Sequence, residues 1–195
     1  MMKLLHRRLA KRGYQVYSFG YASLKCGLDE ILATLDRQIQ SLPEAIIHLV
    51  GYSLGGIIAC RYVNRNPPLK IGRIVLIASP IAGATLAQSS LKRLIGRLLM
   101  GRSLDILAQP QIRAINIRET GAIAGDWSLG LSRLLISLPQ PNDGVVTVAE
   151  TQAPWLKQHI VLPIPHFLAF ISGAVADEVA QFLQSGRFSS RFASE

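Results

Sequence analysis

Residues 45–56 read Ala-Ile-Ile-His-Leu-Val-Gly-Tyr-Ser-Leu-Gly-Gly, and this stretch decides the fold. Its first six residues are nearly all apolar and rich in β-branched side chains, which is typical of a parallel strand buried on both faces. Gly51 ends this strand, and a helix is predicted from Leu54 until Pro67 stops it. The sequence therefore predicts a sharp strand-to-helix turn around Ser53.

Strands and helices alternate on both sides of this turn. The helices predicted from apolar residues at helical spacing cover residues 2–11, 28–42, 54–66 and 174–184. The predicted strands cover residues 14–19, 45–50, 73–78, 112–118 and 160–162. This alternation is typical of an α/β fold, here a three-layer sandwich whose mostly parallel sheet of about five strands is flanked by helices.

The chain has 195 residues, of which 49% are hydrophobic, so one domain over residues 1–195 is predicted. Residues 85–140 are a candidate lid or cap region within it. Leucines over 91–99 lie opposite basic residues, a pattern that fits core packing better than a membrane-surface helix. Residues 120–143 are rich in glycine, serine and proline and are predicted to be irregular, and 186–195 are predicted to be a frayed tail.

The formal net charge is +9, which raises the question of an anionic partner. The basic residues are not interleaved with aromatic ones, so a nucleic-acid partner is not predicted. Contact with a membrane surface has weak support from the same basic residues. The two cysteines give no disulfide framework, and no secretory or membrane-spanning segment is visible, so a cytoplasmic protein is predicted.

Ser53 is the candidate nucleophile. A serine on a tight strand-to-helix turn projects its hydroxyl away from the backbone, and we expect Gly51 and Gly55 to remove side chains that would clash there. The helix that follows has free N–H groups at its positive end, and the N–H of Leu54 is the candidate oxyanion donor. The alternative is a structural glycine-rich turn of the kind found in other doubly wound folds.

A nucleophilic serine requires a histidine base. His6 falls in the first helix, His48 inside the strand before Ser53, and His159 at the start of the last strand, where sites are not built. His166 follows the carboxyl end of that last strand, in a loop at the sheet edge that carries Ser53. It is the predicted base, and the alternative is a capping or surface histidine.

The base in turn requires an acid that orients it. Asp143 precedes His166 by 23 residues, in a turn-rich segment that can expose a carboxylate. The order serine, aspartate, histidine is typical of hydrolases with a serine on such a turn. Asp126 is the second candidate and Glu150 the third, and the alternative for Asp143 is an ordinary Asp-Gly turn.

The sequence resembles the α/β-hydrolase superfamily, and within it the bacterial lipase-like serine esterases of the GPI inositol-deacylase-like group. The likeness is carried by residues 46–56, by Asn-Asp-Gly-Val-Val-Thr-Val at 142–148, and by Leu-Pro-Ile-Pro-His-Phe at 162–167. The resemblance implies Ser53 as nucleophile, Asp143 as acid and His166 as base. It also implies a small-molecule ester or lipid as substrate, with no cofactor and no metal.

The resemblance leaves out one part of the family's pattern. These hydrolases normally begin with two or three more strands and a His-Gly loop that supplies the second oxyanion N–H. Either a longer reading frame supplies them, with Met1 an internal methionine, or residues 14–19 pair directly with 45–50 in a reduced sheet. In the second case the replacement donor would be Gly20 or Tyr21.

Ester hydrolysis through a Ser-His-Asp triad is the function predicted from these residues. An acyltransferase or thioesterase would use the same groups. The alternative from another class is a catalytically impaired binding or partner protein of the same fold, which the missing oxyanion loop favours.

Overall fold

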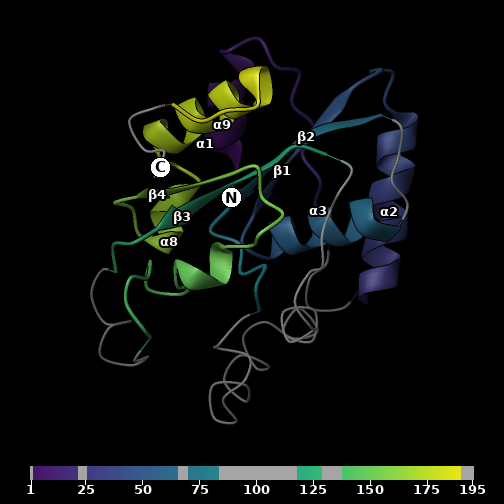
Figure 1. Ribbon diagram of the computed structural model, residues 1–195. Coiled ribbons are helices and arrows are strands. Elements are labelled where there is room, and N and C mark those ends of the chain that lie inside the picture. The colour runs from purple at the N-terminus through teal and green to yellow at the C-terminus, as the bar shows by residue number, and fades with distance from the viewer. Residues whose placement is uncertain (1, 22–25, 66–69, 84–117, 129–137, 190–195) are drawn as a thin grey trace.

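Four parallel strands form the sheet in the computed structural model, which describes residues 2–21, 26–65, 70–83, 118–128 and 138–189 (Figure 1). They are β1 (Ile47–Tyr52), β2 (Ile71–Ile77), β3 (Thr120–Gly125) and β4 (Gln158–Leu162). Their order in space is their order in the chain, and every neighbouring pair is parallel. All four carboxyl ends therefore meet at one edge of the sheet.

Helices cover both faces of this sheet. They are α1 (Lys3–Ala10), α2 (Leu28–Ser41), α3 (Leu54–Arg65), the short α8 (His166–Ala169) and α9 (Gly173–Ser185), with a 3-10 turn η1 (Ala149–Thr151). In Figure 1, α2 and α3 lie on one face, while α1 and α9 pack together on the other. The predicted three-layer α/β architecture is confirmed, with four strands in the described part of the chain instead of about five.

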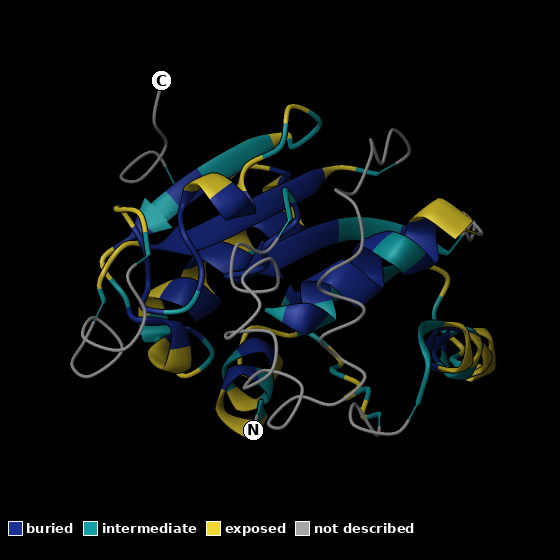
Figure 2. Ribbon diagram, turned by 90° about the horizontal axis from the view of Figure 1, so that it is seen from below, coloured by how far each residue is buried: buried dark blue, intermediate teal, exposed yellow. Residues whose placement is uncertain are grey.

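Alternation along the strands divides the core into two layers. On β2, Ile74 and Leu76 pack in the layer beneath α2 and α3, while Val75 and Ile77 pack in the layer beneath α1 and α9. All four side chains are fully buried, as the dark strands of Figure 2 show. Because β2 is apolar on both faces, it belongs in the middle of a parallel sheet.

The strand β3 corrects the prediction that residues 120–143 are largely irregular. Its sequence, Thr-Gly-Ala-Ile-Ala-Gly, has low strand propensity, yet all six residues are buried. A Cβ on Gly121 would lie 2.6 Å from the Phe182 ring and 2.7 Å from the Phe188 ring. Phe182 of α9 and Phe188 after it therefore require glycine at position 121, and packing overrides strand propensity there.

Residues 14–19 do not form the predicted strand. They are extended in the structure but pair with no strand among the described residues. Tyr14 and Val16 pack against one core layer, while Phe19 packs against the other. These contacts account for the extended backbone, and the pairing of 14–19 with 45–50, one of the two alternatives, is not found among the described residues.

Several of the remaining sequence predictions concern residues that the structure does not describe. Most of the candidate lid (85–140), the helix over 91–99 and the strand over 112–117 lie outside the described residues. Within the segment expected to be a frayed tail, the ring of Phe188 is buried 4.7 Å from that of Phe182, and residues 190–195 lie outside the described part. No described helix is long and apolar enough to cross a bilayer.

Candidate active site

Ser53 lies on the predicted turn between β1 and α3, in a strained backbone conformation. Its φ is 51°, in the left-handed region that a residue with a side chain rarely occupies. Its N–H donates to the carbonyl of Ile77 at 2.8 Å, which fixes the turn to the end of β2. The side chain is partly exposed at the carboxyl edge of the sheet.

Of the two glycines expected to prevent a clash beside Ser53, Gly51 does so and Gly55 does not; Gly56 has this role as well. A Cβ on Gly51 would lie 2.5 Å from the Gly56 nitrogen and 2.7 Å from the Gly55 carbonyl carbon, so only glycine fits at position 51. A Cβ on Gly56 would lie 2.7 Å from Cβ of Ser79. A Cβ on Gly55 would meet nothing within 4 Å, so the expected clash at Gly55 is wrong. Gly51 and Gly56 together allow the helix to pack directly on the end of the strand.

Asp143 is held in a tight loop by its own backbone neighbours. Its Oδ1 accepts hydrogen bonds from the N–H groups of Val145 at 2.9 Å and Val146 at 2.7 Å. Gly144, at a φ of 96°, makes the turn, and the Asn142 side chain accepts its N–H. The carboxylate is buried and is fixed by these bonds to Oδ1, which leave Oδ2 available to accept a hydrogen bond from another group.

Asp143 and His166 form a buried pair. Nδ1 of His166 lies 2.7 Å from Oδ2 of Asp143, and the backbone N–H of His166 donates to the Asp143 carbonyl at 2.9 Å. Because a carboxylate only accepts hydrogen bonds, the contact assigns the proton to Nδ1 and leaves the Nε2 lone pair free. His166 is the first residue of α8, although the sequence had placed it in a loop.

Gly125 allows this pair to sit against the sheet. It is the last residue of β3, and a Cβ there would lie 2.9 Å from Cβ of Asp143 and would overlap the carbonyl of Ile164. The loop that bears Asp143 and the segment that leads to His166 therefore meet over a strand end without a side chain.

Tyr52 connects the turn to the histidine, a role that sequence reasoning missed. Its hydroxyl donates to the carbonyl of His166 at 3.1 Å, and the two rings lie 5.1 Å apart. Burial and the nearby charge of Asp143 raise the pKa of Tyr52, so its hydroxyl stays protonated as a donor. The residue next to Ser53 thus holds His166 in place.

The structure brings Ser53 and His166 to the same region without joining them. Among the described residues, no hydrogen bond links the Ser53 hydroxyl to His166. Leu54 is the first residue of α3, so its N–H belongs to the helical turn that lacks intrahelical acceptors.

The two other candidate acids are placed differently. Asp126 is exposed just after β3, and its backbone N–H donates to the Leu162 carbonyl at 3.2 Å. Glu150 is buried, but its Oε2 accepts from the N–H of Thr147 at 2.7 Å and from the hydroxyl of the same residue. Of the three acids, Asp143 is the one whose carboxylate contacts His166.

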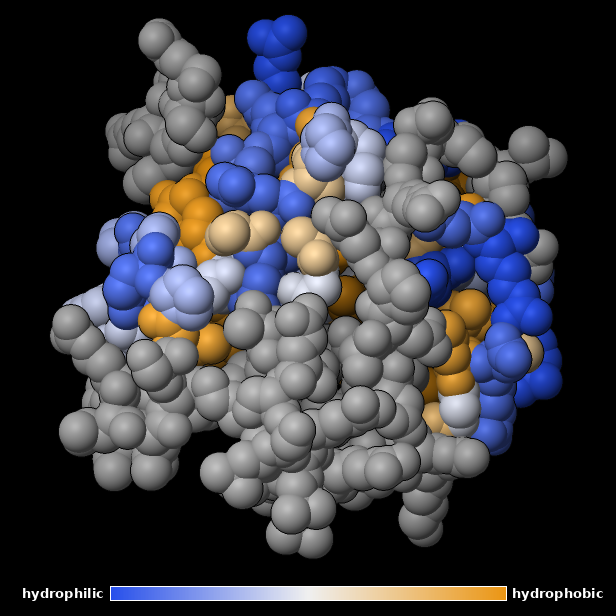
Figure 3. All heavy atoms as spheres, turned by 60° about the horizontal axis from the view of Figure 1, so that its bottom comes forward, coloured by the Kyte–Doolittle hydropathy of each residue, from blue (hydrophilic) through white to orange (hydrophobic). Residues whose placement is uncertain are grey.

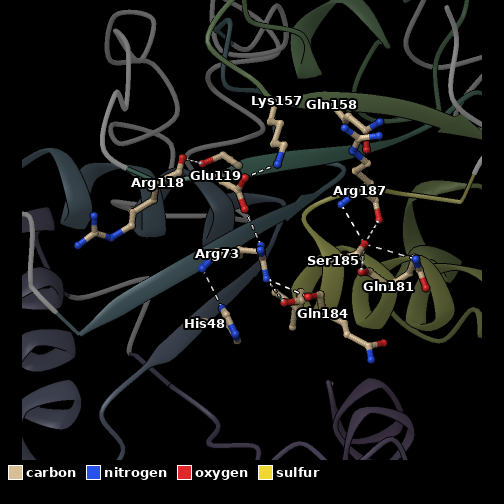
Figure 4. A network of polar contacts seen from close by, with 12 residues as sticks. His48, Arg73, Arg118, Glu119, Lys157, Gln158, Gln181, Gln184, Ser185 and Arg187 are labelled. Atoms are coloured by element: carbon tan, nitrogen blue, oxygen red, sulfur yellow. Dashed lines mark hydrogen bonds and ion pairs between the residues drawn. The ribbon is translucent and has the colours of Figure 1, made fainter.

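The other histidines have structural contacts. His159 contacts the Thr151 hydroxyl at 2.8 Å, and His6 contacts the Ser18 hydroxyl at 3.3 Å. Nδ1 of His48 accepts the backbone N–H of Arg73 at 2.8 Å. In Figure 4 this contact adjoins a row of ion pairs, in which Glu119 binds Arg73 at 2.6 Å and also binds Lys157. Arg73 further donates to the carbonyl of Leu183, near the end of α9.

The surroundings of His48 predict a pH-dependent stability. Burial and the charge of Arg73 lower the pKa of His48, and burial lowers that of His159. Below about pH 6.5 the unfolded chain therefore takes up protons that the folded protein resists, and stability falls as the pH falls. We expect His48→Asn, which keeps an acceptor for the N–H of Arg73, to weaken this dependence. Thermal unfolding measured from about pH 8 to about pH 5 tests it, and an identical dependence in both proteins would contradict it.

A shallow hollow of about 690 Å³ lies away from Ser53, Asp143 and His166. Its lining runs from Gln152 to His159, at the amino end of β4. Ser53, Asp143 and His166 lie at or near the opposite, carboxyl edge of the sheet, so the hollow is separate from the candidate active site.

Comparisons with known proteins agree with the geometry. A family model described as the alpha/beta hydrolase fold matches residues 9–104. A search of curated proteins finds no significant match. Among solved structures, the mature lipase BlEst2 of Bacillus licheniformis has a TM-score of 0.66 at 18% identity, over 92% of this chain and 82% of that one.

Two further solved structures share the fold. A metagenomic carboxyl esterase has a TM-score of 0.57 at 18% identity, over 73% of this chain and 52% of its own. Phospholipase PlaB from Legionella pneumophila has a TM-score of 0.55 at 18% identity, over 75% of this chain and 40% of its own. The present chain therefore spans about half the length of these two proteins or less.

The fold, the turn and these matches define a shortened α/β-hydrolase fold and support the α/β-hydrolase superfamily. A lipase, a carboxyl esterase and a phospholipase are thus among the solved structures that share this fold. The narrower likeness to the GPI inositol-deacylase-like group stays a prediction.

Proposed function

We propose that this protein hydrolyses carboxylic esters through an acyl-enzyme intermediate. Ser53 is the nucleophile, His166 the general base and Asp143 the acid that orients it. The observation that carries the proposal is the buried contact between Asp143 and His166, in a histidine whose backbone is held by Tyr52, the neighbour of Ser53. Strained serine turns of this kind are typical of reactive serines.

The proposed reaction follows from these positions. The Ser53 hydroxyl oxygen attacks the ester carbonyl carbon, while its proton passes to Nε2 of His166. Asp143 stabilises the imidazolium that forms, and the Leu54 N–H donates to the negative carbonyl oxygen. The C–O bond to the alcohol then breaks as His166 returns the proton to the leaving oxygen. Water attacks the acyl-serine by the same route and releases the acid.

A second candidate function is a binding protein of the same fold with impaired catalysis. It is favoured by the absence of a hydrogen bond between the Ser53 hydroxyl and His166 in the described part of the chain. In unliganded enzymes such bonds are often long and shorten when substrate binds. Turnover of p-nitrophenyl acetate and p-nitrophenyl butyrate by the purified protein separates the two candidates, because the binding protein would release no nitrophenol above background.

Asp143 and Asp126 provide a matched pair of variants for this proposal. We expect Asp143→Asn to lower kcat by roughly 10⁴-fold, because an amide in this position favours the wrong histidine tautomer. Asp126→Asn makes the same chemical change at an exposed site after β3, and its activity should stay near that of the wild type. Initial rates with p-nitrophenyl butyrate measure both, and equal losses would contradict the assignment of the acid.

A further inference from the structure

Four large apolar side chains face solvent at the edge of the sheet that carries the candidate site. Phe167 is 68% exposed, Leu168 43% and Ile171 37%, and all three lie within five residues after His166. Trp127, 53% exposed, follows the carboxyl end of β3, the strand that pairs with β4. We call these four residues the apolar rim.

The apolar rim adjoins the candidate active site. The ring of Phe167 lies 5.5 Å from that of His166, edge to face. His166 and Ala169 on the same short helix are buried, so α8 turns one side to the core and the other to solvent. Figure 3 shows apolar surface on both the left and the right of the face drawn there, and α8 lies on the left in Figure 1. Whatever binds the rim therefore lies within reach of the site.

A basic helix lies beside the rim. The Arg8 guanidinium of α1 donates to the carbonyl of Ile171 at 2.7 Å, which places α1 against the end of α8. Lys3, Leu4 and Arg7, which precede Arg8 in α1, are exposed. Helix α1 contains no acidic residue.

The charge around the rim is mainly positive. Residues 3–12 carry five basic side chains, and Arg12 pairs with Asp177 of α9. Asp126, next to Trp127, contributes one opposing exposed carboxylate. An exposed apolar patch bordered by free basic side chains is complementary to a surface with negative headgroups over an apolar layer.

We infer that α1 and the apolar rim dock the protein on an anionic lipid surface, with the candidate active site facing that surface. The docking itself does not depend on the proposed function. Its use for catalysis rests on the proposed function, since it would present esters embedded in the lipid layer to Ser53. The substrate class is thus an ester held in an anionic lipid layer.

Cosedimentation of the full chain with vesicles tests the docking. Ser53→Ala is used so that no lipid is turned over. We expect binding to phosphatidylcholine vesicles that contain phosphatidylserine and little binding to phosphatidylcholine alone. Lys3→Glu with Arg7→Glu should weaken binding by about tenfold or more, because each basic residue near such a surface contributes roughly fivefold.

A matched control makes the same change in net charge on a different part of the protein surface. Arg37→Glu with Arg65→Glu alters the net charge equally on α2 and α3, on the other face of the sheet, and binding should change little. Equal weakening by both pairs would show attraction by overall charge and would overturn the inference. So would equal binding to vesicles with and without phosphatidylserine.

The rim is tested by a second pair of variants and an optical signal. Leu168→Ser with Ile171→Ser should also lose vesicle binding, with circular dichroism to confirm the fold. In Trp155→Phe, Trp127 is the only tryptophan left, and its emission should shift to the blue on binding. No shift would overturn the insertion of the rim. A wild-type dimer that the serine variants convert to monomer would overturn it too, because a second copy would then cover the rim.

The two proposals fail separately. If the wild type hydrolyses p-nitrophenyl butyrate but does not sediment with anionic vesicles, the docking is wrong and the proposed function stands. If it sediments but neither hydrolyses esters nor reacts with a fluorophosphonate, the docking stands and the proposed function is wrong.

Discussion

Replacing Ser53 by alanine is expected to reduce kcat for ester hydrolysis by roughly 10⁴ to 10⁶-fold and to abolish covalent labelling by a fluorophosphonate probe. The change removes the oxygen that would form the acyl-enzyme. Alanine places the same Cβ on the same strained backbone, so the fold should be retained. Labelling followed by gel fluorescence, and initial rates with p-nitrophenyl butyrate, give two independent measurements.

The matched control for this variant is Ser41→Ala, at the exposed end of α2. It makes the same chemical change away from the sheet edge, and both rate and labelling should equal those of the wild type. Labelling that persists in Ser53→Ala would contradict the role of Ser53. Loss in both variants would point to unfolding, which circular dichroism detects.

The second large effect concerns stability and the two glycines beside Ser53. Gly51→Ala is expected to lower the free energy of unfolding by about 3 kcal/mol or more, because its Cβ would overlap the backbone of Gly55 and Gly56. For a chain of this length that corresponds to a fall in Tm of about 6 to 12 °C. Thermal unfolding followed by circular dichroism measures it.

Gly55→Ala is the control within the same turn. Its Cβ would have no neighbour within 4 Å, and the position lies in the first turn of α3. Alanine favours the helix by up to about 1 kcal/mol over glycine, so Tm should stay the same or rise by about 2 to 4 °C. If Gly51→Ala and Gly55→Ala lowered the Tm equally, overlap with the backbone of Gly56 would not be the reason that position 51 requires glycine.

The parts of the fold that could be predicted are those in which local pattern and packing agree. The apolar residues before Gly51 predict a strand, and the helix begins at Leu54 as predicted, although β1 runs from Ile47 to Tyr52 and so passes through Gly51. Asp143 could be chosen before Asp126 because it lies in a turn-rich segment 23 residues before His166, and the structure brings its carboxylate to His166.

The rest depends on contacts between distant segments. Strand β3 was missed because Gly121 makes room for Phe182 and Phe188, residues that lie some 60 positions later. Residues 14–19 are extended and contact both core layers, but a local pattern does not show whether an extended segment has a strand to pair with. The role of Tyr52 was hidden, since it exists only when the end of β1 lies beside α8.

The positive φ of Ser53 has a consequence for how this turn can change over evolution. A serine at φ 51° costs about 1 kcal/mol or more compared with glycine, whose backbone occupies that region freely. The most stable residue for this position is therefore one that carries no hydroxyl. If the proposed chemistry is retained, selection for turnover holds the protein below its stability optimum at one position, and lineages released from that selection are free to exchange serine for glycine.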